Sequence, residues 1–172
     1  MSSNPPKQTK PGTKAKISCR DRALRLLASR NYTAKELKER LVREDYPARE
    51  VEWAIRWLIE IGYVNDRLTA ELFVDYRNRF RPTGVRGLRF ELEQKGVDPE
   101  TIDAVINSPS QDYALAYDLA KARLAKLQHL PVHRQYQRIG GLLERRGFSW
   151  DVITRVLEAL FNSLLDTDLE KV

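Results

Sequence analysis

Two stretches of the chain, LEQKGVD at residues 92–98 and LERRGFS at residues 143–149, follow the same pattern 51 residues apart. Each runs from a leucine through an acid and polar or basic positions to a glycine, an apolar residue and a helix-capping residue. A glycine after helix-forming residues is typical of a helix end, and Asp or Ser shortly after it is typical of the next helix start. Both stretches are therefore predicted to be equivalent turns in a repeated helical unit.

The agreement between these two copies extends outward from the turns. Leu88 corresponds to Ile139 before the turn, and Ile102 corresponds to Ile153 after it. These are the positions that would face the core of each unit, so the match concerns packing as well as turn chemistry.

A third copy lies another 51 residues toward the N-terminus, where Leu37, Leu41 and Val51 fall into register. This copy has Asp45 where the others have glycine, and Pro47 where they have a capping residue. We therefore expect its turn to differ from the other two by one residue.

Helical periodicity continues through almost the whole chain, and no alternating β-type stretch competes with it. The sequence predicts an all-α protein of three tandem three-helix repeats, about nine helices, in an extended, curved array. The expected segments are a disordered basic tail (1–16), repeat 1 (17–64), repeat 2 (65–108), repeat 3 (109–163) and an acidic C-terminal tail (164–172).

Local signals predict where several helices begin. Thr33 and Glu36 have the spacing of a capping box, Asp66 is the expected cap of the following helix, and Asp98 before Pro99 is a strong start signal. In the helix after Asp66, apolar side chains recur at three- and four-residue steps, which predicts a core-facing stripe: Leu68, Leu72, Phe73 and Tyr76.

A tryptophan pair, Trp53 and Trp57, is separated by one helical turn beside the apolar stripe of its helix. This helix is apolar on more than one face, so we expect it to lie between neighbouring helices. The alternative is an exposed aromatic patch that binds a partner.

Composition narrows the class of function. The 172 residues carry a formal net charge of +6, which favours a polyanion or an acidic protein surface as partner.

The single cysteine excludes an internal disulfide, and neither a membrane-spanning run nor a secretory signal is seen, so we expect a cytoplasmic location. His129 and His133 are separated by Pro131 and have no acidic or thiol partner nearby, and no glycine-rich phosphate loop or catalytic constellation is recognisable. The sequence therefore predicts no enzyme activity, cofactor or metal.

The positive charge is concentrated in a few segments. Residues 76–90, YRNRFRPTGVRGLRF, contain five arginines and no acid, with aromatic residues interleaved. Arginine forks suit phosphates and carboxylates, although a solvated connection with inward-facing aromatics is the alternative. The candidate residues for binding a partner or nucleic acid are Arg22, Arg25, Arg30, Arg67, Tyr76, Arg77, Arg79, Arg81, Arg86, Arg89 and Lys95.

The central part of the chain resembles the RecX family. The residues that carry the resemblance are Gly62-Tyr63-Val64-Asn65-Asp66, Ala70, Phe73, Arg79, Gly84, Arg89, Leu92 and Lys95-Gly96-Val97, together with Ala23 to Arg30, Thr33, Glu36, Leu37 and Leu41 upstream. The resemblance covers about residues 18–162, and the third repeat matches mainly in pattern. The Arg81-Pro82-Thr83 approach to Gly84 departs from it, because another basic or small residue is expected there.

RecX proteins are bacterial regulators of the recombinase RecA. The resemblance implies tandem three-helix repeats, no catalysis, and binding within the groove of the RecA–DNA filament. It also implies that such a protein limits filament growth and damps strand exchange, ATP hydrolysis and coprotease activity, and so modulates recombination, DNA repair and the SOS response. We expect the protein to act as a monomer. Direct contact with single- or double-stranded DNA is a further expectation.

Two alternatives stay open at this level. Residues 33–64 could form a helix-turn-helix of a stand-alone DNA-binding protein, although Val51, Trp53, Ile55 and Trp57 are poor groove readers. The chain could also be a helical adaptor for another acidic protein.

Overall fold

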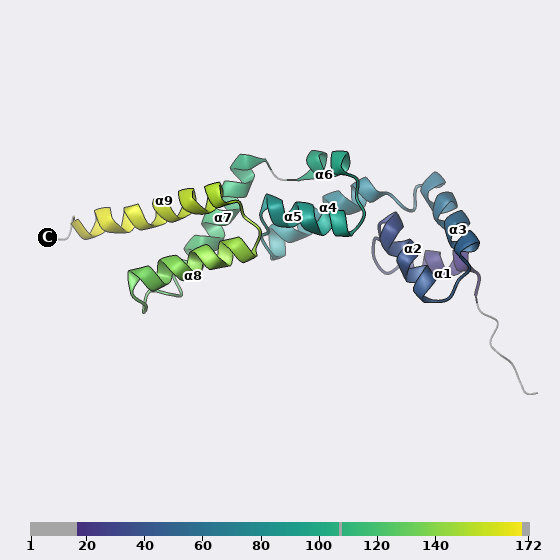
Figure 1. The fold of residues 1–172 in the computed structure, drawn as a ribbon, viewed down its shortest axis with the longest axis horizontal. Helices are drawn as coiled ribbons and strands as arrows, with labels where there is room; N and C mark the ends of the chain where they lie inside the picture. Colours follow the sequence, from purple (N-terminus) through teal and green to yellow (C-terminus); the bar gives the residue numbers. More distant parts are fainter. Residues whose placement is uncertain (1–16, 107, 170–172) are drawn as a thin grey trace, which may run out of the picture.

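The computed structural model describes residues 17–106 and 108–169, and over that part of the chain it contains helices and no β-strand (Figure 1). The predicted all-α class with three tandem three-helix repeats is confirmed. The basic tail expected at residues 1–16 lies outside the described residues, and the last helix includes positions 164–169 of the expected acidic tail. The helices are α1 (Cys19–Leu27), α2 (Ala34–Arg43), α3 (Ala48–Glu60), α4 (Asp66–Phe80), α5 (Val85–Gln94), α6 (Pro99–Val105), α7 (Pro109–Leu124), α8 (Val132–Arg145) and α9 (Trp150–Leu169).

Each repeat closes around a hydrophobic cluster of its own, so the three cores do not merge. Helices α1–α3 enclose the first cluster, α4–α6 the second and α7–α9 the third. The repeats follow one another along the long axis of the molecule, with α1–α3 at one end and α8 and α9 at the other (Figure 1). The central cluster has the fewest buried members: Ala70, Val74, Leu88, Leu92, Val97 and Ile102.

Helix starts follow the sequence signals with one correction and one addition. Thr33 and Glu36 form the predicted capping box, and Asp98 accepts a hydrogen bond from the Thr101 amide. The cap of α4, however, is Asn65 rather than Asp66, and the Asp66 carboxylate points to another helix. A second capping box at Ser108 starts α7, which the sequence analysis did not identify.

The turn after α2 has the same geometry as the turns after α5 and α8, so the expected one-residue difference is wrong. Asp45 has φ 60°, while Gly96 and Gly147 have φ 79° and 75°. In each case the next amide donates back to a leucine carbonyl near the helix end, as Tyr46 does to Leu41. Asp is among the few non-glycine residues that tolerate this left-handed conformation, which explains how it replaces glycine here.

The contact between repeats 1 and 2, here called the first junction, joins the start of α2 to the turn after α5. The Thr33 hydroxyl donates to the Lys95 carbonyl (2.6 Å), and the Lys35 ammonium donates to the Gln94 carbonyl (3.0 Å). The Asp66 carboxylate completes the junction by accepting from the Ala34 amide (2.8 Å). A free N–H group at the start of α2 is thereby satisfied by the next repeat.

The contact between repeats 2 and 3, the second junction, joins the start of α5 to the turn after α8 in the same way. The Gly84 amide donates to the Arg146 carbonyl (2.8 Å), and the Gly87 amide donates to the Gly147 carbonyl (3.2 Å). Asp112 takes the role of Asp66, because its carboxylate accepts from the Val85 amide (3.0 Å). The internal repeat therefore extends to the contacts between repeats as well as to the units.

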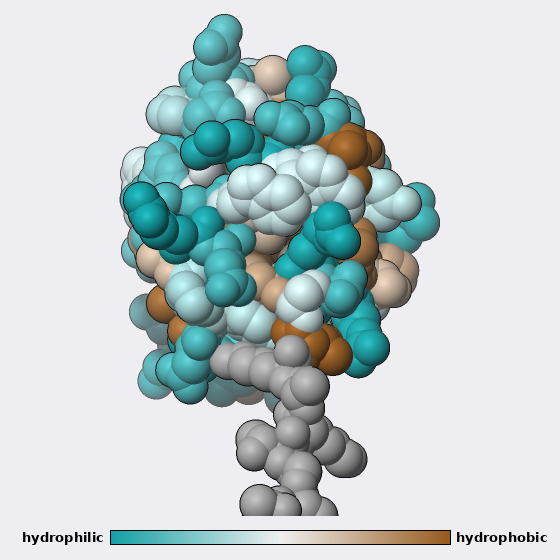
Figure 2. Space-filling view, turned by 90° about the vertical axis from the view of Figure 1, so that its right-hand side faces the viewer, coloured by the Kyte–Doolittle hydropathy of each residue, from teal (hydrophilic) through white to brown (hydrophobic). Residues whose placement is uncertain are grey.

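The tryptophan pair lies partly at the surface, which differs from the expected position between helices. Trp57 packs against the first core, but Trp53 is 56% exposed. The two rings are stacked with centroids 6.4 Å apart, and the Arg20 guanidinium lies 5.1 Å from the Trp57 ring centroid. The repeat 1 end of the molecule is otherwise mostly hydrophilic, with scattered hydrophobic residues (Figure 2).

Candidate partner-binding surface

Many of the predicted binding residues form ion pairs within the chain. In repeat 2 the Arg77 guanidinium lies 2.6 Å from a Glu91 carboxylate oxygen, and Arg89 pairs with Asp103. The Arg77 side chain is only 17% exposed and also lies over the Phe73 ring. These arginines join helices of their own repeat, so only some of their N–H groups are available to bind a partner. Further pairs are Arg22–Glu44, Arg30–Glu36, Arg67–Glu71 and Lys95–Glu36.

Arg22 is engaged most completely. Its Nε and Nη2 atoms donate to the two Glu44 oxygens at 2.6 and 2.7 Å, which ties α1 to the end of α2. The hydrogen bonds from Arg22 lower the pKa of the Glu44 carboxyl. A bidentate pair of this kind mainly orients the two helices within repeat 1.

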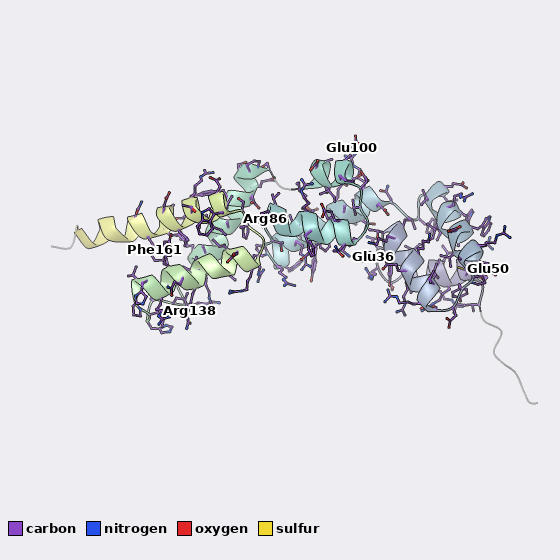
Figure 3. The ribbon with its side chains drawn as sticks, in the orientation of Figure 1. Glu36, Glu50, Arg86, Glu100, Arg138 and Phe161 are labelled. Atoms are coloured by element: carbon purple, nitrogen blue, oxygen red, sulfur yellow. The ribbon has the colours of Figure 1, made fainter. Side chains whose placement is uncertain are left out.

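The remaining predicted arginines, Arg25, Arg79, Arg81 and Arg86, form no ion pair among the side chains that the structure describes. All four are exposed. Arg86 lies at the start of α5, near repeat 3 (Figure 3). These residues keep their full capacity to bind anionic groups.

An exposed apolar ridge runs along α4 and corrects the expected core-facing stripe. Leu68, Leu72, Tyr76 and Phe80 follow at four-residue steps and are 50%, 45%, 57% and 67% exposed. The core face of α4 is instead formed by Ala70, Val74 and part of Phe73. The Tyr76 and Phe80 rings contact each other, with centroids 5.2 Å apart. We call these four residues the α4 ridge.

A cleft of about 510 Å³ lies beside the α4 ridge at the first junction. Its lining combines the apolar and aromatic side chains of Leu72, Phe73 and Tyr76 with Arg30 and Lys95, and the Lys95 ammonium lies 5.1 Å from the Phe73 ring centroid. Glu36 lies where α2 faces repeat 2 (Figure 3), and its carboxylate is 2.6 Å from the Lys95 ammonium and 3.7 Å from the Arg30 guanidinium. The cleft thus combines apolar and aromatic surface with charges that are already partly neutralised.

The carboxylates at the two junctions have shifted pKa values. Burial acts to raise the pKa of Glu36, but hydrogen bonds from Lys95 and from the Thr33 amide outweigh it and lower that pKa. For Asp66 and Asp112 burial dominates and raises the pKa, although each accepts a backbone hydrogen bond. Only Glu36 is therefore held firmly in its charged form by a cationic partner.

Other classes of site lack support in the described part of the chain. No group of three His, Cys, Asp or Glu side chains is arranged to hold a metal ion there. Among the described helices, none is both long and apolar enough to cross a membrane. What these residues do offer is an extended surface of apolar, aromatic and cationic side chains.

Sequence reasoning missed the acidic partners of the arginines and the exposure of the α4 ridge. One signal was present for the partners: Lys38–Glu52 in repeat 1 and Arg89–Asp103 in repeat 2 are ion pairs related by the 51-residue offset. No comparable signal marked the ridge, because three- and four-residue spacing is the same for a core-facing stripe and an exposed one.

Comparison with known proteins agrees with this architecture repeat by repeat. The family model described as "RecX, first three-helix domain" matches residues 19–58, the second three-helix domain matches 65–106 and the third matches 110–157. The chain resembles proteins named "Regulatory protein RecX". The one from Thermobifida fusca is 35% identical over 78% of this chain and 74% of its own length, and that from Trichlorobacter lovleyi is 36% identical over 86% and 98%.

Solved structures show the same fold. A crystal structure of RecX from Lactobacillus salivarius superimposes with a TM-score of 0.72 at 22% identity, covering 83% of this chain and 94% of that one. A second RecX crystal structure gives a TM-score of 0.70 at 24% identity, covering 80% and 69%. From the three family domains and the extent of these likenesses, the chain belongs to the RecX family of regulatory proteins.

Proposed function

We propose that this protein binds the RecA–DNA filament and inhibits filament growth, ATP hydrolysis, strand exchange and coprotease activity. It would thereby modulate recombination, DNA repair and the SOS response. The observation that carries the proposal is the α4 ridge, an exposed apolar row in the central repeat of a chain that belongs to the RecX family. Exposed rows of this kind, flanked by charge, mark protein interaction sites.

The extended shape supports binding to a long partner. Three repeats with separate cores follow one another along one axis, so the molecule presents three surfaces in succession (Figure 1). A filament offers repeated subunits at regular spacing, and an array can contact more than one of them. Such an array gains affinity from several modest contacts.

Regulation of this kind needs no catalysis, because occupying the filament surface is sufficient. We therefore propose a non-enzymatic protein that needs no cofactor, acts as a monomer and works in the cytoplasm with RecA. The names of the relatives, which describe regulatory proteins, support a role of this class.

The stand-alone helix-turn-helix alternative requires α3 as the helix that enters the DNA groove, and the residues of α3 do not favour that role. Its Val51, Ala54, Ile55 and Leu58 are buried in the first core. The exposed charges on the rest of the helix are Arg49, Arg56, Glu50, Glu52 and Glu60. Acids outnumber bases on this face, which is unfavourable for a helix that enters a DNA groove.

The test measures RecA ATP hydrolysis on single-stranded DNA as this protein is added. We expect inhibition at concentrations well below that of RecA. Replacing Leu72, Tyr76 and Phe80 by serine should weaken the inhibition by roughly tenfold or more, because several buried contacts of an interface are lost together. No inhibition by the folded wild-type protein, even at equal concentration, would show that the proposal is wrong.

Ile59→Ser with Val132→Ser is the matched control, because both residues are exposed apolar side chains outside the α4 ridge. It should inhibit like the wild type. Equal losses of inhibition in the control and the ridge variant would show that the ridge is not part of the binding surface. Circular dichroism establishes that each variant is folded.

A further inference from the structure

The second junction has a cleft of its own, of about 180 Å³, which corresponds to the cleft at the first junction. Arg81 and Arg146 line it at the positions that Arg30 and Lys95 occupy one repeat earlier, each 51 residues farther along the chain. The hydrogen bonds at the two junctions also correspond in position. Thr33 donates to the Lys95 carbonyl through its hydroxyl, and Gly84 donates to the Arg146 carbonyl through its amide, so the equivalence concerns position in space and not only in sequence.

The two clefts differ at the position between their cations. In the first cleft this position is Glu36, whose carboxylate lies close to both Lys95 and Arg30. In the second cleft it is Gly87, and close packing keeps it a glycine. A Cβ atom there would lie 2.7 Å from the Thr83 methyl group and 3.0 Å from the Arg146 carbonyl oxygen. The second cleft therefore has the cations of this arrangement without the central carboxylate.

Like charges meet in this second cleft. Arg146 is anchored by donating from Nη1 to the Pro82 carbonyl (3.2 Å), which leaves its other N–H groups available. Burial, followed by the charges of Arg81 and Arg77, lowers the pKa of Arg146. The acids that line the cleft are Glu91, already paired with Arg77, and the exposed Glu144. With Arg145 on the rim, the arginines exceed the acids.

We propose that the second cleft binds a phosphate group of a nucleic-acid backbone, held between Arg81 and Arg146 where the first cleft holds the Glu36 carboxylate. The phosphate would supply the negative charge that the chain itself lacks at this position. Two guanidinium groups can share one phosphate through forked hydrogen bonds, and a neutralised like-charge pair is stabilised.

Phe90 favours a single-stranded nucleic acid over an acidic protein as the source of the anion. It lines the same cleft and is 62% exposed. Stacking of a base on an aromatic ring beside a bound phosphate is the usual arrangement for single-stranded nucleic acids, whereas a protein carboxylate gains nothing from such a ring. This contact goes beyond the proposed function, because it requires no recombinase.

The experiment measures binding of the full chain, without recombinase, to a fluorescent thymidine oligonucleotide of about 20 nucleotides. The variants are Arg81→Gln alone and Arg81→Gln with Arg146→Gln. The control is Arg43→Gln with Arg56→Gln, which removes the same charge from exposed positions in repeat 1. We expect the double variant to bind about tenfold more weakly and to reduce the salt slope by about 1–2, with less than about twofold change in the control.

Competition separates the sources of the anion. If the sugar–phosphate backbone of the nucleic acid is the ligand, inorganic phosphate should displace the oligonucleotide no better than sodium chloride of the same ionic strength. Superior displacement by inorganic phosphate would point to a free-phosphate site and overturn the nucleic-acid assignment. Loss of polyglutamate binding with unchanged oligonucleotide binding would likewise overturn it in favour of an acidic protein. If the double variant is unfolded by circular dichroism, the exposed Arg81→Gln variant decides, and unchanged affinity there refutes the proposal.

Discussion

The first and second junctions share one backbone arrangement but are closed by different chemistry. At the first junction the contacts come largely from side chains: the Thr33 hydroxyl, the Lys35 and Lys95 ammonium groups and the Glu36 carboxylate. At the second junction Gly84 and Gly147 let two backbones approach until amides bond directly to carbonyls. A repeat protein can thus keep the geometry between its units while the chemistry of each contact changes.

Because of this difference, the bonds that join the repeats and the cationic side chains that can bind a partner involve different groups at the second junction. Glu36 neutralises the cations of the first junction, whereas at the second the backbone bonds join the repeats and leave Arg81 without an ion pair among the described side chains. A junction closed by glycines can therefore leave its cationic residues free for a partner. Substitutions at the two junctions should show this difference in the size and the pH dependence of their effects.

The largest effect is expected for Gly84→Ala. The backbone of Gly84 has φ −69°, which any residue adopts, so the loss would come from contact alone. The new Cβ would lie 2.4 Å from the Phe148 Cα and N atoms, which forces the two repeats apart. We expect a loss of about 3 kcal/mol or more in the free energy of unfolding, measured by urea denaturation.

Gly140→Ala is the control for this prediction, because its Cβ would meet the Leu157 side chain at an ordinary 3.5 Å. It should leave stability unchanged or raise it by up to about 1 kcal/mol through helix propensity. Equal stability of the Gly84→Ala and Gly140→Ala proteins would contradict the close backbone contact at the second junction.

An intermediate effect is expected for Gly96→Ala at the first junction. Gly96 has φ +79°, and a Cβ atom there would lie 2.5 Å from the Lys35 Cδ. Gly62 has a similar φ of +77° with no atom near the corresponding Cβ position, so Gly62→Ala carries the backbone strain alone. We expect each to lose about 1 kcal/mol to that strain. Gly96→Ala should lose more, because the new Cβ would also lie 2.7 Å from the Lys35 Cβ, which is fixed to the backbone of α2 and cannot rotate away. Thermal unfolding compares the two, and a larger loss in Gly62→Ala would contradict the assignment.

The smallest effects depend on pH and have opposite signs for Glu36 at the first junction and Asp112 at the second. The folded pKa of Glu36 lies below its unfolded value of about 4.3, so its charge stabilises the fold above that pH and this contribution is lost as the pH falls through the folded pKa. Glu36→Gln should therefore cost about 1 kcal/mol at neutral pH and little in acid, after allowing for solvent screening.

At the second junction Asp112→Asn should behave in the opposite way. Burial raises the folded pKa of Asp112, so the fold loses stability as the pH rises from the unfolded value of about 3.9 through the folded one. Asparagine can still accept from the Val85 amide without a buried charge, and it should be neutral or stabilising at pH 7. Urea denaturation across this pH range checks both variants, and parallel pH profiles would contradict the assignment of charge to the two junctions.

The sequence predicted the fold well because the fold depends on local and repeated signals. The capping box at Thr33, the cap at Asp98 and the 51-residue recurrence each follow from residues that are close together or in register. It was wrong about the turn at Asp45, since aspartate can adopt the left-handed conformation that usually identifies glycine. Residue type alone therefore predicts the geometry of a turn poorly where two residue types can adopt the same backbone conformation.

The candidate surface was harder to predict because it depends on contacts between distant residues. Arg77 and Arg89 looked free in the sequence, but their carboxylate partners are 14 residues farther along the chain, on neighbouring helices. Asp66 looked like a cap for its own helix, but its carboxylate caps α2 of the preceding repeat. Likewise, the orientation of the α4 ridge follows from which face α4 turns toward its small core, and spacing within one helix does not determine this.

The three separate cores have a mechanical consequence. Tension applied along the array would load each junction in series, and a junction rests on a few hydrogen bonds, whereas each repeat rests on a whole buried cluster. The array would therefore extend by separating its repeats before any repeat unfolded. When the tension was removed, the folded repeats would dock again without refolding, so the extension of the chain would be reversible.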